Sequence, residues 1–242
     1  MAHFYLNESL TSAEVSDVVE LTGPEARHAV TVSRVHIGDD LVVGNGSGLV
    51  LTGTVTEAEP LRLTLSVTGA VQHERDQPGI WLVQALAKGD RDEMAVQAVT
   101  ELGIDGIIPW SASRSIVRWE GAKVAKGRER WAAIAREATK QSVRPWLPEV
   151  ADLVSTKQLA QLAKSTQMLV LDPEGSQTLT SVTVADQDLV VVVGPEGGIA
   201  PGELDALTAA GAIRVRLGDN VLRTSTAGPA AVAVLSAKLG RW

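Results

Sequence analysis

Apolar residues in the first 70 positions follow the two-residue period of β-strands. Short apolar stretches at 41–43, 48–55 and 61–67 are separated by glycine, asparagine and proline, which favour turns. The segment 44–48 (GNGSG) predicts a tight turn, because glycine adopts positive φ angles without strain. A short helix is expected at 23–33. This pattern predicts a small β-barrel.

The period changes after a polar stretch at 72–79 (QHERDQPG), which predicts a boundary between a domain at 1–72 and a domain at 73–242. Beyond it, the apolar runs predict strands at 80–86, 106–109, 168–171, 189–193 and 213–217. Helices are predicted between them at 90–102, 126–141, 201–210 and 226–239. Strands that alternate with helices indicate an α/β fold, in which helices cover both faces of a parallel sheet.

The composition narrows the chemistry. The chain has 242 residues, 45% of them hydrophobic, and no cysteine, so disulfides, thiolate metal sites and a cysteine nucleophile are excluded. Three of the four histidines precede residue 40, and no metal site is expected. Residues 1–10 lack the pattern of a signal peptide, and the longest apolar run, at 189–193, is too short to cross a bilayer. A soluble, cytoplasmic protein without a membrane partner is expected.

The net charge of −7 is unevenly distributed along the chain. Residues 1–70 carry a net charge of −6, whereas residues 110–146 carry +6 and four of the six tryptophans, Trp110, Trp119, Trp131 and Trp146. Basic side chains beside aromatic rings suit phosphate contact and base stacking. The same residues would equally fit a solvated helix face with its tryptophans in the core. The charge distribution therefore keeps RNA open as a partner, although the total is acidic.

Two glycine-bearing loops follow predicted strands in the last third of the chain. The segment 194–198 (GPEGG) precedes the helix predicted at 201–210, and the segment 217–227 (LGDNVLRTSTA) precedes the last helix. Ligands of open parallel sheets bind beyond the carboxyl ends of the strands, although each loop alone could be an ordinary turn. Neither loop matches the motifs GxxxxGK[ST] or GxGxxG, so the expected ligand is not a nucleotide polyphosphate.

Five segments together resemble one family. They are 28–43 (HAVTVSRVHIGDDLVV), 84–109 (QALAKGDRDEMAVQAVTELGIDGIIP), 136–150 (REATKQSVRPWLPEV), 194–207 (GPEGGIAPGELDAL) and 217–227. In this order they resemble the bacterial 16S rRNA uridine-N3 methyltransferases of the SPOUT class, over nearly the whole chain. The resemblance implies a PUA-like β-barrel that assists RNA binding, followed by an α/β domain with a C-terminal trefoil knot. It also implies a homodimer that methylates a uridine of the small ribosomal subunit.

The same resemblance implies S-adenosylmethionine as cofactor, with S-adenosylhomocysteine as product and no metal. Matching the family's motifs residue by residue places ten residues of this chain at the cofactor site. They are Leu171, Gly194, Glu196, Gly197, Gly198, Leu217, Gly218, Val221, Leu222 and Thr226.

Methylation of uracil N3 requires loss of a proton or stabilisation of the resulting anion. A guanidinium near the uracil oxygens would stabilise that anion, and Arg223 is the first candidate, although it could instead form a salt bridge that shapes its loop. Glu196 could act as a base or could hold backbone amides of the loop. Arg144 is a candidate for contact with the target base or a phosphate, and Glu101 could orient one of the arginines.

RNA contacts are expected from basic residues that lie mostly within 88–144. The candidates are Arg27, Arg34, Lys88, Arg91, Arg114, Arg118, Lys123, Lys126, Arg128, Arg130 and Arg144. The chain departs from the family in its acidic residues 1–70 and at Ser225, where the family usually has an acidic residue. No histidine lies near Ser225 in the sequence, so a hydrolytic triad has no support.

Two alternatives remain open from the sequence. The chain could methylate a ribose 2′-oxygen or a tRNA, although segments 84–109 and 136–150 argue against this. It could also be an inactive RNA-binding assembly factor, although the two intact loops and Arg223 argue against that role.

Overall fold

The computed structural model describes residues 4–242, which divide into two compact units. The first unit contains the residues up to Arg75 together with Thr139–Leu147, and the second contains Asp76–Ala138 and Pro148–Trp242. The chain leaves the first unit within the polar stretch 72–79, but the sequence gives no sign that 139–147 belongs there. Residues 1–3, part of the stretch 1–10 and of the predicted domain 1–72, lie outside the described residues.

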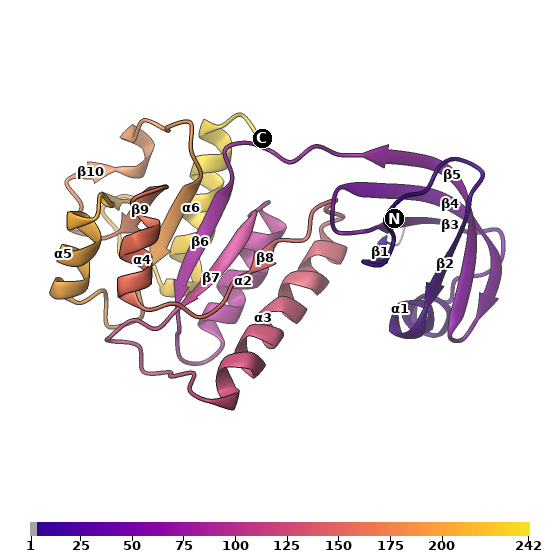
Figure 1. The fold of residues 1–242 in the computed structure, drawn as a ribbon, viewed down its shortest axis with the longest axis horizontal. Coiled ribbons are helices and arrows are strands. Elements are labelled where there is room, and N and C mark those ends of the chain that lie inside the picture. The colour runs from indigo at the N-terminus through magenta and orange to yellow at the C-terminus, as the bar shows by residue number, and fades with distance from the viewer. Residues whose placement is uncertain (1–3) are drawn as a thin grey trace. The chain divides into compact units, whose positions relative to one another are not determined.

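The first unit is built on a mixed five-stranded sheet in the order β1-β3-β4-β5-β2 (Figure 1). Its strands are β1 (Phe4–Leu6), β2 (Val18–Thr22), β3 (Asp40–Gly44), β4 (Leu49–Glu59) and β5 (Arg62–Gln72). The three predicted strands are confirmed as β3, β4 and β5. β1 pairs in parallel with β3, and the other pairs are antiparallel. Alternate side chains of β4 and β5, such as Leu51 and Leu65, form the core.

The helix predicted at 23–33 forms in two parts, α1 (Gly23–Arg27) and the π-helical turn η1 (His28–Val32). Pro24 at the start of α1 suits a first helical turn, where its missing N–H has no partner to lose. His28 packs edge-on to Tyr5, and His36 is exposed beside Asp39.

The segment 139–147 is bound to the first unit by its backbone and by one ion pair. The Gly48 amide donates to the Pro145 carbonyl and the Leu147 amide donates to the Gly46 carbonyl, each at 3.0 Å. Lys140 Nζ lies 3.1 Å from Glu25 Oε1, with both side chains largely buried. The first unit is therefore assembled from two stretches of chain that are far apart in sequence.

The second unit contains a seven-stranded sheet in the order β10-β12-β9-β11-β6-β7-β8, with every pair parallel. Its strands are β6 (Ile80–Ala85), β7 (Gly106–Trp110), β8 (Glu149–Val150), β9 (Gln167–Leu171), β10 (Gln177–Thr178), β11 (Leu189–Val193) and β12 (Ile213–Arg216). The parallel sheet and the five predicted strands are confirmed. β8 and β10 have only two residues each, too few to show a period.

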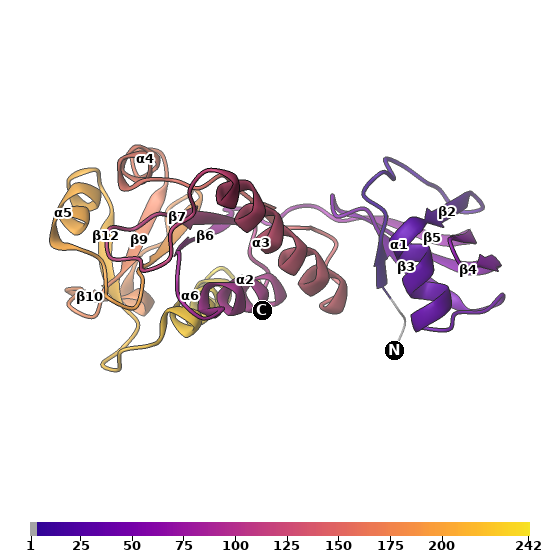
Figure 2. The same cartoon turned by 90° about the horizontal axis from the view of Figure 1, so that it is seen from below.

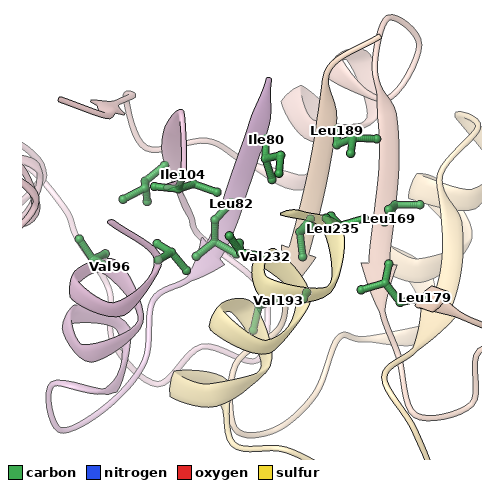
Figure 3. Packing of buried hydrophobic residues seen from close by; sticks show 14 of the residues in the cluster. Ile80, Leu82, Val96, Ile104, Leu169, Leu179, Leu189, Val193, Val232 and Leu235 are labelled. Carbon is green, nitrogen blue, oxygen red and sulfur yellow. The ribbon is translucent and has the colours of Figure 1, made fainter. Parts of the chain in front are cut away.

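Helices cover both faces of this sheet (Figure 2). They are α2 (Arg91–Glu101), α3 (Ala122–Gln141), α4 (Thr156–Leu162), α5 (Pro201–Ala209) and α6 (Thr224–Lys238), with a 3₁₀ turn η2 (Leu179–Ser181). Leu189 and Val191 of β11 pack in one apolar cluster with α2, α3 and α6 (Figure 3). Val190 and Val192 face the opposite cluster with α4 and α5. The all-apolar strand follows from burial on both faces.

The tryptophans of the basic segment mostly belong to the core. Trp110 and Trp131 are buried, and Trp119 packs edge-on to Trp131 at 5.2 Å between ring centroids. Gly127 of α3 lies directly under the Trp119 ring, where a Cβ would collide. Base stacking by Trp110 and Trp131 is therefore the wrong interpretation. Within residues 4–242, no helix is long and apolar enough to cross a membrane.

Candidate active site

A cavity of about 650 Å³ opens at the carboxyl ends of β9, β11 and β12. Because these strands are parallel, the loops that follow them meet at one edge of the sheet. The volume lies within the range of about 300–1,000 Å³ typical of small-molecule sites. Eight of the ten predicted cofactor residues line this cavity. They are Leu171, Gly194, Glu196, Gly198, Leu217, Gly218, Val221 and Leu222.

Gly197 and Thr226 are the two predicted cofactor residues that do not line the cavity. The Gly197 carbonyl accepts a hydrogen bond from Arg114 Nη1 at 3.1 Å. In α6 the lining residues are Thr224 and Ala227, which share a helix face because they are three positions apart. Thr226 lies in the same helical turn as these two residues, and its contact with the cofactor stays a prediction.

The carboxylate of Glu196 joins the first glycine loop to the loop after β6. Its Oε1 accepts hydrogen bonds from the Lys88 amide at 2.9 Å and from Arg91 Nη1 at 3.0 Å. Partial burial alone would raise the pKa of Glu196, but hydrogen bonds from backbone amides and the Arg91 charge outweigh it and bring the pKa below its usual value. A carboxylate with a lowered pKa is a weaker base. The geometry therefore favours loop organisation over proton abstraction.

Glu203 is a second organising carboxylate, and the motif analysis missed it. It accepts hydrogen bonds from the Ser113 amide at 2.9 Å, the Ser113 hydroxyl at 2.8 Å and the Thr156 hydroxyl at 2.7 Å. The Ala200 amide donates to it at 3.3 Å, a link that joins the third residue of α5 to the residue before the helix. Burial raises the pKa of Glu203, but the hydrogen bonds that its carboxylate accepts lower the pKa by more. The pKa of Glu203 therefore lies below its usual value. The sequence signal that could have revealed this role is a glutamate at the third position of the helix predicted at 201–210.

Several predicted RNA contacts have partners within the protein. Arg118 donates to the Ala112 and Ser113 carbonyls, each at 2.7 Å, and so shapes the loop that carries Arg114. Arg130 Nη2 donates to Glu93 at 2.6 Å, and Arg128 Nε donates to the Val150 carbonyl at 3.0 Å. These arginines therefore also support the fold, and their contact with RNA stays a prediction.

The remaining predicted RNA contacts are spread over both units. Lys88 is exposed and Arg91 lines the cavity, as does Arg114. Lys123 and Lys126 are exposed on α3, and Arg27 and Arg34 are exposed on the first unit. Arg144 belongs to the segment 139–147 and is not one of the cavity-lining residues.

Glu101 has no arginine partner among residues 4–242, and its carboxylate accepts a hydrogen bond from Gln97 at 3.0 Å. Among residues 4–242, no group of histidine and acidic side chains could hold a metal ion.

The second loop presents Arg223 at the cavity. Arg223 precedes α6, and its carbonyl accepts hydrogen bonds from the Thr226 and Ala227 amides at 2.8 and 2.9 Å. Its side chain is exposed, lines the cavity, and has no hydrogen-bond or ion-pair partner in the described residues 4–242. The salt bridge considered as an alternative is therefore not formed there, and the guanidinium is available to a ligand.

Comparison with known proteins agrees with this fold and this cavity. The family model described as an RNA methyltransferase domain matches residues 74–236, and the model described as an RNA methyltransferase PUA domain matches residues 21–68. The class of the protein is thus an RNA methyltransferase with a PUA domain, as the sequence resemblance predicted.

Relatives narrow the class further. The ribosomal RNA small subunit methyltransferase E of Mycobacterium bovis is 39% identical over 99% of this chain and 92% of its own. The protein of the same name from Bacillus subtilis is 30% identical over 98% and 96%. The Neisseria gonorrhoeae structure of that name, bound to S-adenosyl methionine, has a TM-score of 0.89 at 27% identity and covers 98% of both chains. The chain belongs to the ribosomal RNA small subunit methyltransferase E family.

Proposed function

We propose that this chain transfers a methyl group from S-adenosylmethionine to N3 of a uridine in 16S rRNA of the small ribosomal subunit. The cavity at the ends of β9, β11 and β12 is the observation that carries the proposal. It is lined by eight of the ten residues that the family motifs assign to the cofactor, and a relative of the same fold binds S-adenosyl methionine.

The residues that line the cavity fit this cofactor. A Cβ at Gly194 would lie only 2.6 Å from the Ile199 side chain. Glycine is therefore needed at 194 so that Ile199 can pack against the loop backbone at the cavity. Leu171, Leu217 and Leu222 offer apolar surface to the adenosine, while loop backbone groups offer hydrogen bonds. When bound, the cofactor supplies an electrophilic methyl group.

Among the side chains of the protein, Arg223 is the one that stabilises the reacting uracil. Loss of the N3 proton places negative charge on the two uracil oxygens, and a guanidinium held at the cavity stabilises that charge. Glu196 is engaged with Lys88 and Arg91 and has a lowered pKa, so we assign it to loop organisation. Arg144 would contact the target base or a phosphate.

Phosphate contacts are assigned first to Lys88, Arg91 and Arg114, which lie at or beside the cavity. Lys123 and Lys126 on α3 extend this set, and Arg27 and Arg34 add single contacts on the acidic first unit. The trefoil knot and the homodimer follow from the family resemblance, and they belong to the proposal together with the cytoplasmic location expected from the sequence.

Mass spectrometry of 16S rRNA from a strain that lacks this protein tests the proposal directly. We expect 3-methyluridine to disappear and to return when the gene is restored. Full retention of 3-methyluridine would exclude the function. Calorimetry with S-adenosylmethionine separates the enzyme from an inactive assembly factor, because only the enzyme requires cofactor binding.

A further inference from the structure

Gln84 is a polar side chain buried in the middle of the parallel sheet. It belongs to β6, pairs with Val193 of β11 in register, and is 0% exposed among apolar neighbours. Burial of an amide costs free energy unless its groups are hydrogen-bonded. A glutamine at this position therefore needs a reason.

Its amide begins a chain of hydrogen bonds that ends at the cavity. Gln84 Nε2 donates to the Thr224 hydroxyl at 2.8 Å, and the Thr224 hydroxyl donates to the Gly194 carbonyl at 2.9 Å. A hydroxyl has one proton, and Thr224 uses it on Gly194, so it can only accept from Gln84. The chain of hydrogen bonds therefore joins β6 to the start of the first cavity loop, at Gly194, and to the end of the second, at Thr224.

The side-chain oxygen of Gln84 is not part of this chain of hydrogen bonds. Gln84 Oε1 is buried without a hydrogen-bond partner among residues 4–242. An unpaired buried acceptor destabilises the fold, so stability alone would favour an apolar side chain of the same length. Gln84 Nε2 also donates to the Ala85 carbonyl at 3.0 Å, so both of its protons are paired, and only the bond to Thr224 carries a benefit outside β6.

That benefit is the placement of α6. The residue before this helix is Arg223, whose side chain does not cap it, and no other side chain caps its first turn in the described chain. Serine, threonine, aspartate or asparagine usually fixes a helix start at this position. Here the start depends instead on Thr224, held by Gln84. Arg223 directly precedes Thr224, so the same bonds fix its backbone.

We propose that Gln84 is a positioning residue of the methyl transfer site, which holds Arg223 at the cavity through Thr224. The inference rests on the proposed function, because it assumes that Arg223 acts on the substrate. Gln84 itself does not line the cavity and touches neither ligand.

Gln84→Met removes the amide at nearly constant length. Because this also removes the unpaired acceptor, we expect the Tm to stay within about 4 °C of the wild type. The single-turnover rate of methyl transfer to small ribosomal subunits that lack the modification should fall by about 10- to 100-fold. Affinity for S-adenosylmethionine should change by less than about threefold, since a tenfold change would require about 1.4 kcal/mol.

Gln167→Met is the matched control. Gln167 also lies at 8% exposure in a strand of this sheet, and its amide bonds the Thr183 carbonyl and the Ala185 amide, but it does not line the cavity. We expect it to lower Tm and leave the transfer rate unchanged. An equal loss of rate in both variants would overturn the proposal.

Thr224 provides a second route if Gln84→Met does not fold. Thr224→Val should slow transfer, Thr224→Ser should restore it, and the Gln84→Met/Thr224→Val double variant should lose no more than the worse single variant. Additive losses, or wild-type rates in all variants, would overturn the inference. Wild-type protein that methylates nothing would instead overturn the proposed function, so the two failures are distinguishable.

Discussion

The loop at 194–200 and the loop at 218–222 form two walls of one cavity but are held very differently. The first is hydrogen-bonded to three distant segments, through the Lys88 amide, Arg114 and Thr224. The second, within the described chain, makes no hydrogen bond of its own, and Val221 is 78% exposed. One wall is therefore held in place by hydrogen bonds to the rest of the protein, whereas the other is not.

The two loops thus differ in the role that we assign to them, one in cofactor binding and the other in methyl transfer. The fastened wall determines the shape of the cavity, and the loose wall ends at Arg223, the side chain assigned to the substrate. Pre-organisation reduces the entropic cost of binding, while a loop that orders late can couple arrival of RNA to completion of the site. Four substitutions test this division.

Arg223→Ala should have the largest effect, because it removes the charge assigned to the uracil anion. We expect methyl transfer to fall by about 100- to 1,000-fold, the range for loss of one stabilising donor. Affinity for S-adenosylmethionine, measured by calorimetry on the same sample, should stay within several-fold. Retained turnover would show that the loose wall does not carry the chemistry.

Glu203→Ala should loosen the fastened wall. It leaves the Ser113 and Thr156 hydroxyls and two backbone amides without their acceptor, a loss of about 2–4 kcal/mol. We expect cofactor affinity to fall by about tenfold or more. Asp205→Ala, which removes an exposed charge from the same helix, is the control and should bind normally. Equal affinities would mean that the wall needs no fastening.

Glu196→Gln should slow transfer by less than about tenfold, below the usual effect of losing a general base. Because its folded pKa is lowered, the stability from Glu196 is present above the usual pKa of 4.5 and is lost as pH falls through the folded value. The carboxylate is thus ionised throughout the neutral range. A fall in rate at acidic pH that is present in the wild type and absent from Glu196→Gln would instead identify Glu196 as the base.

Val221→Ala should have the smallest effect. Because this side chain is largely exposed, its truncation should change the free energy of unfolding by less than about 0.5 kcal/mol. Ile199→Ala in the fastened wall removes a side chain packed against the core and should cost more. Urea denaturation of both variants measures the loss in the free energy of unfolding for each wall. Equal losses would contradict the proposed difference between the two loops.

The sequence predicted the elements that have a clear period. The run at 189–193 is apolar on both faces because both faces are buried, and the alternation at 48–55 follows from a half-buried sheet. The glycine motifs led to the cavity because parallel strands bring their carboxyl ends together.

Other features could not be predicted because they depend on contacts between distant residues. The two-residue strand β8 has no period, and Trp131 in the basic helix gave no sign of which side it faced. Gln84 is a single polar residue in an apolar stretch, and its hydrogen-bond partner Thr224 lies 140 positions away in the sequence. Arg118 and Arg130 have internal partners that the sequence does not show, and their contact with RNA stays a prediction.

The segment Thr139–Leu147 has a consequence for biosynthesis. A nascent chain that ends at Arg75 already contains all five strands of the first sheet, yet it lacks Lys140, the partner of the buried Glu25, and the backbone that joins Gly46 and Gly48. That unit cannot be completed until translation has passed Leu147, well into the second unit. The first unit therefore completes its folding only after part of the second unit has been synthesised.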